Sequence, residues 1–224
     1  MTTLDHVVLT LPVRGTWRAE MSPARRVPSH GTHLFAATYA IDFVAVQGRR
    51  SATIRDWRTA FSTEPPERFF AFGRPILAPT SGRVVRIHDG EADHEARRSQ
   101  LARASYALTQ AARARGGAAA LAGNHVIIER DGGGYVVLAH LLTGSIRVDE
   151  GERVAIGHEV GRCGNSGNST QPHVHLQVMD SPDPSTARGL PIAFQDYRVW
   201  PGAGGAPIAV ELGIPGEGEV VEGL

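Results

Sequence analysis

The feature that most constrains the fold is the division of the sequence into short apolar segments by glycine and proline. The chain has 224 residues, of which 26 are Gly and 14 are Pro. Apolar and β-branched residues gather between these turn signals in six segments, at 41–46, 83–87, 125–129, 135–139, 153–160 and 173–178. Several short strands separated by turn signals are typical of an antiparallel all-β domain. The glycine-rich run 131–134 also predicts a hairpin between two of these strands.

One segment departs from the strand pattern. Residues 91–115 are rich in Ala, Arg, Leu and Gln, and Leu101, Ala104 and Leu108 recur at helical spacing. The following Gly116 is a stop signal for a helix. We therefore predict a helical insertion around residues 91–115.

The length and charge of the chain limit its organisation and its partners. A chain of this length can bury one core, so we expect one domain over residues 1–200 that contains the insertion. Residues 201–224 are rich in Gly and Pro and are expected to form an extended tail. The 23 Lys and Arg residues balance 23 Asp and Glu residues, which leaves no overall field to attract nucleic acid.

Cys163 is the single cysteine, so an internal disulfide and a Cys-rich zinc site are excluded. Any metal ligands must then be histidines and carboxylates. The N-terminal sequence lacks a basic region followed by an apolar region, and no apolar run is long enough to cross a bilayer. We expect no transmembrane segment, and the sequence leaves both the cytoplasm and the cell envelope open.

The segment His173-Val174-His175 is the most informative candidate for a functional site. Alternate residues of a strand point to the same face, so both imidazoles can belong to one site. The alternative is a pair of solvated surface histidines. The preceding loop, residues 161–172, contains three glycines and one proline and can form the wall of a cleft.

Other candidate residues lie far from this pair in the sequence. Asp42 is an acid within an apolar segment, where an unpaired carboxylate would be costly to bury and where a metal or an arginine would compensate it. His30 and His33 precede it, and spacing alone does not separate them as ligands. His140 ends an apolar strand, where it can face a cleft or be capped by a carbonyl group.

These segments match, in order along the chain, a known set of family motifs. The forms GxPVxAPxxGxV, GNxVxI, YxHL, VxxGxxV and GxxGxSTGPHxHxEV correspond to residues 73–84, 123–128, 135–141, 148–154 and 161–178. With the segment 30–42, the chain resembles the M23 (LytM/lysostaphin-type) zinc metallopeptidases, which cleave peptide bonds in bacterial peptidoglycan. The resemblance covers residues 30–180 apart from the insertion, and it implies an antiparallel β-sheet or barrel-like sandwich.

The resemblance also implies a site. In the family, Zn²⁺ is held by a His, an Asp and the second His of HxH, which correspond here to His30 (or His33), Asp42 and His175. The catalytic histidines of the family correspond to His140 and His173. His30 is the favoured first ligand, because the segments around it are similar to a branch of the family with a widely spaced first histidine.

The sequence departs from the family pattern at three places. The family spacing is HxxxD, whereas eleven residues separate His30 from Asp42. Gln171 replaces a glycine and Gln177 replaces an acid of the final motif. Neither glutamine removes a proposed ligand, although both positions can alter the shape of the cleft.

The function implied is that of a zinc-dependent endopeptidase acting on peptidoglycan peptides or another peptide substrate. One alternative is a catalytically silent module of the same fold that binds or regulates a cell-wall enzyme, and this class is expected to lack one or more ligands. Another is a phosphotransfer domain that uses the paired histidines, which would have no role for Asp42. The sequence does not identify the bond cleaved or the oligomeric state.

Overall fold

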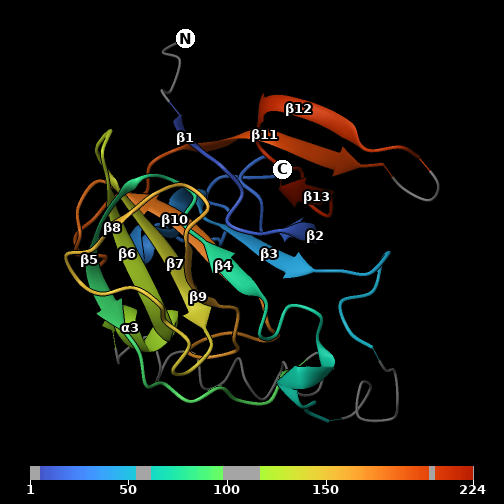
Figure 1. Ribbon diagram of the computed structural model, residues 1–224, viewed down its shortest axis with the longest axis horizontal. Coiled ribbons are helices and arrows are strands. Elements are labelled where there is room, and N and C mark those ends of the chain that lie inside the picture. The colour runs from blue at the N-terminus through green and yellow to red at the C-terminus, as the bar shows by residue number, and fades with distance from the viewer. Residues whose placement is uncertain (1–5, 54–61, 98–116, 202–204, 224) are drawn as a thin grey trace.

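The computed structural model describes residues 6–53, 62–97, 117–201 and 205–223 (Figure 1). The elements follow the order β1 (Val7–Leu9), β2 (Gly15–Glu20), η1 (Leu34–Tyr39), β3 (Ile41–Ala45), η2 (Pro66–Arg68), β4 (Pro75–Leu77), β5 (Gly82–His88), α3 (Gly117–Ala122), β6 (Asn124–Arg130), β7 (Tyr135–Leu141), β8 (Arg153–Val154), β9 (Glu159–Arg162), β10 (Val174–Met179), β11 (Ile192–Trp200), β12 (Ile208–Gly213) and β13 (Val220–Gly223). The predicted all-β class is confirmed.

Most strands belong to one large sheet in the order β1-β11-β13-β2-β3-β10-β7-β6-β5-β8, with β12 paired to β11. All of its pairings are antiparallel except that of β1 with β11. Strands β4 and β9 form a separate two-stranded sheet. Among the described strands the large sheet does not close into a barrel.

Side chains along the central strands alternate between the buried core and a second face of the sheet. On β3, Ile41 and Phe43 belong to the main core, and on β10, Leu176 belongs to it as well. Asp42 and His175, the intervening residues, line a cavity instead. Because side chains alternate between the two faces of a strand, one face of β3 and β10 is core and the other is the floor of a cavity.

The predicted hairpin at 131–134 is present between β6 and β7. Its turn is closed by a hydrogen bond from the Arg130 N–H to the Gly134 carbonyl oxygen at 3.0 Å. Gly133 and Gly134 have φ values of 85° and 81°, which favour glycine. The composition of this turn therefore explains why it was recognisable in the sequence.

The C-terminal stretch expected as an extended tail takes part in the sheet. Strand β13 lies between β2 and β11, and Val221 is fully buried in the main core. Just before β13, the Glu217 carboxylate accepts a hydrogen bond from the Ser22 N–H at 2.9 Å. Glycine and proline in this region mark the turns between strands, and the division into residues 1–200 and 201–224 stays a prediction.

Three further expectations from the sequence can be compared with the structure. Most of the predicted helical insertion at 91–115 lies outside the described residues, and its described part, residues 91–97, has no helix. The predicted strand 153–160 is divided into β8 and β9 by a turn in which Gly157 has a φ of 83°. Within the described ranges, no helix is both long and apolar enough to cross a membrane.

The position of β13 gives a test of the fold. Deleting residues 219–224 should lower the free energy of unfolding by at least about 3 kcal/mol, because it removes a buried valine and exposes the backbone of both neighbouring strands. Urea unfolding followed by circular dichroism measures the loss. Leu212→Ala on β12 is the control, since Leu212 is exposed and its loss should change stability by no more than about 0.5 kcal/mol. Equal stability of the two variants would contradict the role of β13.

Candidate metal centre and cleft

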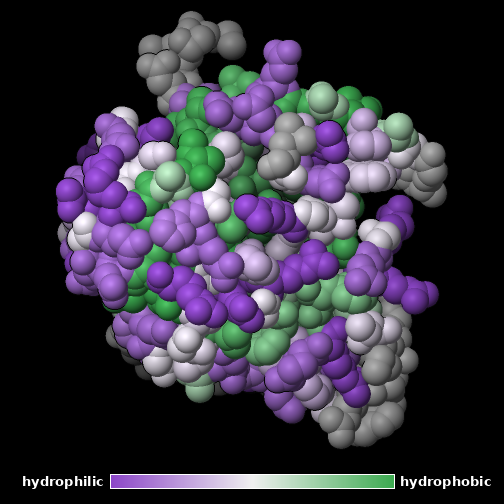
Figure 2. Space-filling model, viewed as in Figure 1, coloured by the Kyte–Doolittle hydropathy of each residue, from purple (hydrophilic) through white to green (hydrophobic). Residues whose placement is uncertain are grey.

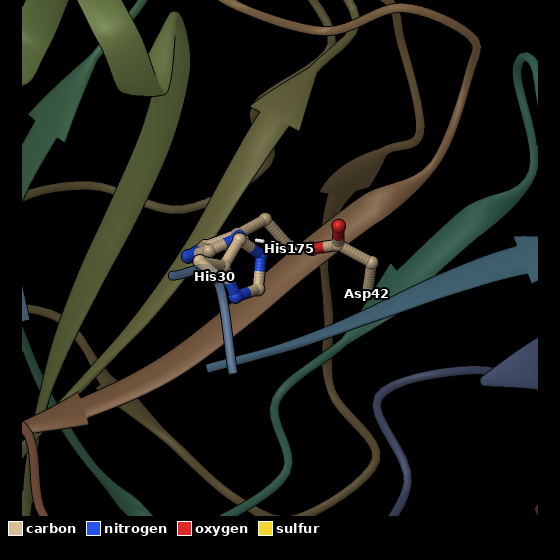
Figure 3. A group of neighbouring side chains, drawn as sticks. All are labelled: His30, Asp42 and His175. Carbon is tan, nitrogen blue, oxygen red and sulfur yellow. Dashed lines mark hydrogen bonds and ion pairs between the residues drawn. The ribbon is translucent and has the colours of Figure 1, made fainter. Parts of the chain in front are cut away.

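The pairing of β3 with β10 places a carboxylate beside an imidazole. The register sets His175 opposite Asp42, and the His175 Nδ1 atom lies 2.9 Å from the Asp42 Oδ1 atom. The His30 Nε2 atom lies 3.3 Å from the same oxygen. One possible ligand atom from each of these three residues lies within 4.8 Å of the other two (Figure 3).

His30 reaches this position because the long loop before β3 folds back on itself. The Ser29 N–H donates to the Thr38 carbonyl oxygen at 2.9 Å, and the Ser29 hydroxyl donates to the Ala37 carbonyl oxygen at 3.3 Å. The Ser29 hydroxyl oxygen lies 3.1 Å from the His30 Nδ1 atom, from which it can accept a hydrogen bond. This arrangement holds the imidazole with its Nε2 atom directed at Asp42.

His33 lies outside this group. Its side chain is exposed, and its Nδ1 atom contacts the Thr38 hydroxyl at 3.0 Å. The structure therefore brings His30, and not His33, together with Asp42 and His175.

The three side chains fit a divalent metal such as zinc. Two nitrogens and one oxygen form a donor set that catalytic zinc sites use, with metal–ligand distances of about 2.0–2.2 Å. Ligand atoms at two corners of a tetrahedron of that size are about 3.3–3.6 Å apart, by geometry from those distances. The distance from the Asp42 oxygen to the His30 nitrogen, 3.3 Å, matches this spacing, and the distance to the His175 nitrogen, 2.9 Å, is a few tenths of an ångström shorter.

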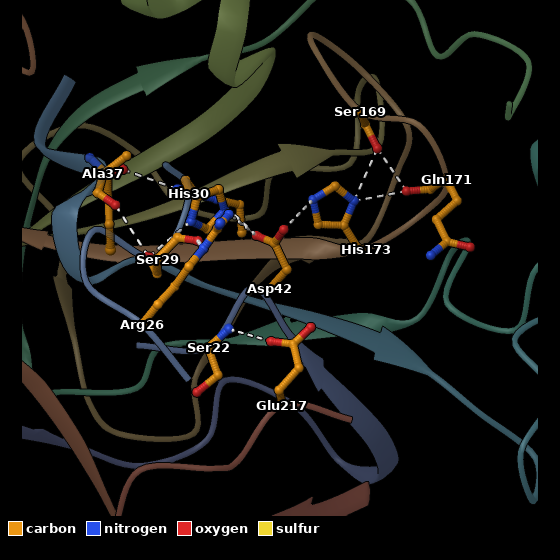
Figure 4. A network of polar contacts seen from close by, with 12 residues as sticks. Ser22, Arg26, Ser29, His30, Ala37, Asp42, Ser169, Gln171, His173 and Glu217 are labelled. Carbon is orange, nitrogen blue, oxygen red and sulfur yellow. Dashed lines mark hydrogen bonds and ion pairs between the residues drawn. The ribbon is translucent and has the colours of Figure 1, made fainter. Parts of the chain in front are cut away.

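His173 and His140 lie beside the three-residue group. The His173 ring centroid is 4.6 Å from that of His140, and its Nε2 atom is 3.6 Å from the Asp42 Oδ2 atom. The Nδ1 atom of His173 donates to the Gln171 carbonyl oxygen at 2.8 Å (Figure 4). The Nδ1 atom of His140 donates to the Ser166 carbonyl oxygen at 3.0 Å. In the neutral form, each Nε2 atom therefore carries a lone pair.

A bulge in β7 sets the direction of His140. The register with β6 shifts between Asn124 and Val126, and one extra residue of β7 is accommodated there. His140 has a φ of 62°, a left-handed conformation that is uncommon for a residue other than glycine. In a regular strand His140 would share the face of the core residue Leu138, whereas here it contacts the rings of His173 and His175. The strained bulge thus directs the imidazole into the site.

The charges of the group shift the pKa values of its members. Burial acts to raise the pKa of Asp42, but the neighbouring histidines His173, His30 and His175 hold it well below its usual range. Burial acts to lower the pKa of His175, but the hydrogen bond and charge of Asp42 raise it overall. Burial and the nearby histidines lower the pKa of His140, which keeps this ring neutral near pH 7.

A cavity of about 840 Å³ opens above these side chains. The four histidines and Asp42 form part of its lining, and Val137 and Ala139 contribute from β7, while another part carries Arg86, His88, His125 and Asp183. Figure 2 shows one face of the molecule as a whole, on which hydrophilic residues predominate and hydrophobic residues form several areas between them. The cavity is large enough for a short peptide segment.

The structure brings together the five site residues favoured from the sequence, and it shows orienting groups that the sequence reasoning missed. Ser29, Ser166 and Gln171 fix three of the histidines through a hydroxyl or a backbone carbonyl group. The serine at 29 was adjacent to a candidate ligand, which was a usable signal. The backbone carbonyl groups leave no signature in the sequence, because any residue can supply them.

Comparison with known proteins gives the class of the chain. Residues 68–187, more than half of the chain, match the model of Peptidase family M23. The chain therefore belongs to peptidase family M23. His140, His173 and His175 lie within the matched segment, whereas His30 and Asp42 precede it.

Solved structures similar to this chain include M23 proteins of two bacteria. The catalytic domain of the antimicrobial peptidase lysostaphin from Staphylococcus simulans is 19% identical, with a TM-score of 0.38, over 68% of this chain and 77% of that one. A variant of the catalytic domain of the prophage-encoded M23 protein EnpA from Enterococcus faecalis is 22% identical, with a TM-score of 0.36, over 66% of this chain and 85% of that one.

The pKa shifts give a test of the site in metal-free protein. The raised pKa of His175 contributes stability that is complete below its ordinary value of 6.5 and is lost as the pH rises through its folded-state pKa. The lowered pKa of Asp42 contributes stability that is complete above its ordinary value of 3.8 and is lost as the pH falls. Asp42→Asn should therefore cost about 3–5 kcal/mol near pH 5 and clearly less at pH 9.

Urea unfolding in the presence of a chelator at the two pH values measures this difference. Asp149→Asn is the control, because Asp149 is exposed and lies outside the cavity lining. A cost for Asp42→Asn that does not change with pH would show that the carboxylate is not coupled to His175.

Proposed function

We propose that this protein is a zinc-dependent endopeptidase that hydrolyses peptide bonds in bacterial peptidoglycan. The observation that carries the proposal is the convergence of three possible ligands and two further histidines at one cavity. Membership of peptidase family M23 supports a peptide substrate.

His30, Asp42 and His175 are the residues that would hold the metal. Zinc at such a site acts as a Lewis acid towards a carbonyl group and lowers the pKa of water. The side chains are prepared for this role, because the lowered pKa of Asp42 keeps it anionic. The Ser29 hydroxyl also favours the His30 form in which Nε2 carries the lone pair.

His173 and His140 are the proposed catalytic residues. Each directs its Nδ1–H group to a backbone carbonyl, so its Nε2 lone pair is available to accept a proton from the attacking water. The protonated ring can then donate a hydrogen bond from Nε2 to the developing oxyanion, or a proton to the leaving amine. The lowered pKa of His140 favours the neutral ring at the start of the reaction.

The proposal predicts different effects for two histidine substitutions. His175→Ala should remove both bound zinc and cleavage, because it deletes a ligand. His140→Ala should retain zinc and reduce the cleavage rate about 10²–10⁴-fold, which is the usual contribution of a general acid–base group. Zinc content by mass spectrometry and the digestion of defined cell-wall peptides, with and without a chelator, measure both quantities.

His33→Ala is the matched control, since His33 lies in the same loop as His30 but outside the site. It should retain both zinc and activity. Loss of zinc in His140→Ala would contradict the assigned roles. A wild-type protein that binds no zinc and cleaves none of the peptides would favour the catalytically silent module.

A further inference from the structure

The side chain of Gln177 connects the ring of His175 to the loop that carries His30. Its Oε1 atom lies 3.0 Å from the His175 Nε2 atom, and its Nε2 atom donates to the Phe35 carbonyl oxygen at 2.8 Å. Gln177 is buried, two residues beyond His175 on the same face of β10. Both ends of its amide group are therefore used.

The bond to Phe35 fixes the orientation of the amide. A carbonyl oxygen can only accept a hydrogen bond, so the NH₂ group of Gln177 must face Phe35 and its oxygen must face His175. The His175 Nε2 atom then carries a proton and donates it to this oxygen. The opposite nitrogen, Nδ1, is the atom directed at Asp42 and the candidate metal position.

The Phe35 carbonyl group lies in a strained part of the loop. Phe35 and Ala36 have φ values of 54° and 62°, in the left-handed region that is uncommon for residues with a side chain. Gly189 packs closely against this turn, because a Cβ atom at that position would lie 2.4 Å from the Ala36 carbonyl oxygen. The hydrogen bond from Gln177 is thus one of the contacts that hold an unfavourable backbone conformation in place.

An amide meets these requirements and a carboxylate does not. A glutamate at position 177 could accept a hydrogen bond from His175, but it has no N–H group to donate to Phe35. Gln177, which stands where the family has an acid, therefore contacts the long loop of eleven residues between His30 and Asp42 directly.

We propose that Gln177 is a positioning residue that keeps a proton on the Nε2 atom of His175 and fastens the His30 loop to the metal centre. The metal part of this inference depends on the proposed function, whereas the ring and loop parts also apply to the zinc-free protein. A ligating histidine commonly donates its second ring N–H to a neighbouring acceptor, and loss of that acceptor weakens metal affinity about 10–100-fold.

Two substitutions separate the two hydrogen bonds. Gln177→Met keeps a long side chain but removes both bonds, and Gln177→Glu keeps the acceptor for His175 but removes the donor to Phe35. Gln195→Met is the control, because Gln195 lies on β11 outside the cavity lining. The readouts are zinc affinity by chelator competition, the one-bond ¹H–¹⁵N signal of the His175 Nε2 atom, and amide hydrogen exchange over Leu34–Tyr39.

Gln177→Met should weaken zinc binding about 10–100-fold, remove the protected Nε2–H signal and speed amide exchange in the loop at least tenfold. Gln177→Glu should keep the ring signal and zinc affinity within about threefold of wild type, while its loop exchanges as fast as in Gln177→Met. Gln195→Met should match wild type in all three readouts.

The proposal is overturned if Gln177→Met retains the ring signal and the zinc affinity of wild type, or if Gln177→Glu leaves loop exchange unchanged. If Gln177→Met does not fold, the loop exchange of Gln177→Glu decides. If wild type binds no zinc, the proposed function fails, and the ring signal and loop exchange of zinc-free protein still test the role of Gln177.

Discussion

The pairing of β3 with β10 is the constraint on which the site depends. Antiparallel register puts Asp42 opposite His175, and strand alternation directs both towards the cavity while their neighbours fill the core. A carboxylate in this position would be costly to bury alone. The surrounding imidazoles compensate it, and a metal ion would do so more completely. Core packing and site geometry are therefore consequences of the same register.

Much of the strand arrangement was readable in the sequence because Gly and Pro mark its turns. The hairpin between β6 and β7 is the clearest case, since its glycines occupy conformations that other residues avoid. Strands β12 and β13 were not readable, because a glycine-rich composition conceals short strands and because β2, one partner of β13, lies at the opposite end of the sequence. Pairing of this kind depends on tertiary contacts that local propensity does not contain.

The favoured site residues could be identified from the sequence for a different reason. His173 and His175 have the two-residue spacing of a strand, and the ordered motifs pointed to His30, Asp42 and His140 by family resemblance. The sequence did not predict in which direction these side chains point. The bulge that turns His140 and the loop that returns His30 are backbone features. Neither feature follows from residue type. The geometry of the structure therefore gives the physical reason for preferring His30 over His33 as a ligand.

The residues that form the floor of the cavity determine how a site of this kind can change during evolution. Val137 and Ala139 lie on the face of β7 that borders the cavity, and Ala139 pairs directly with His175, while Val136 and Leu138 belong to the main core. Replacing the small Ala139 with a bulkier residue would make the cavity shallower without a change in the main core. The positions of β7 that shape the ligand site thus alternate with those that fill the main core, and they pack instead in a separate hydrophobic cluster with Ala36, Ile127 and Met179.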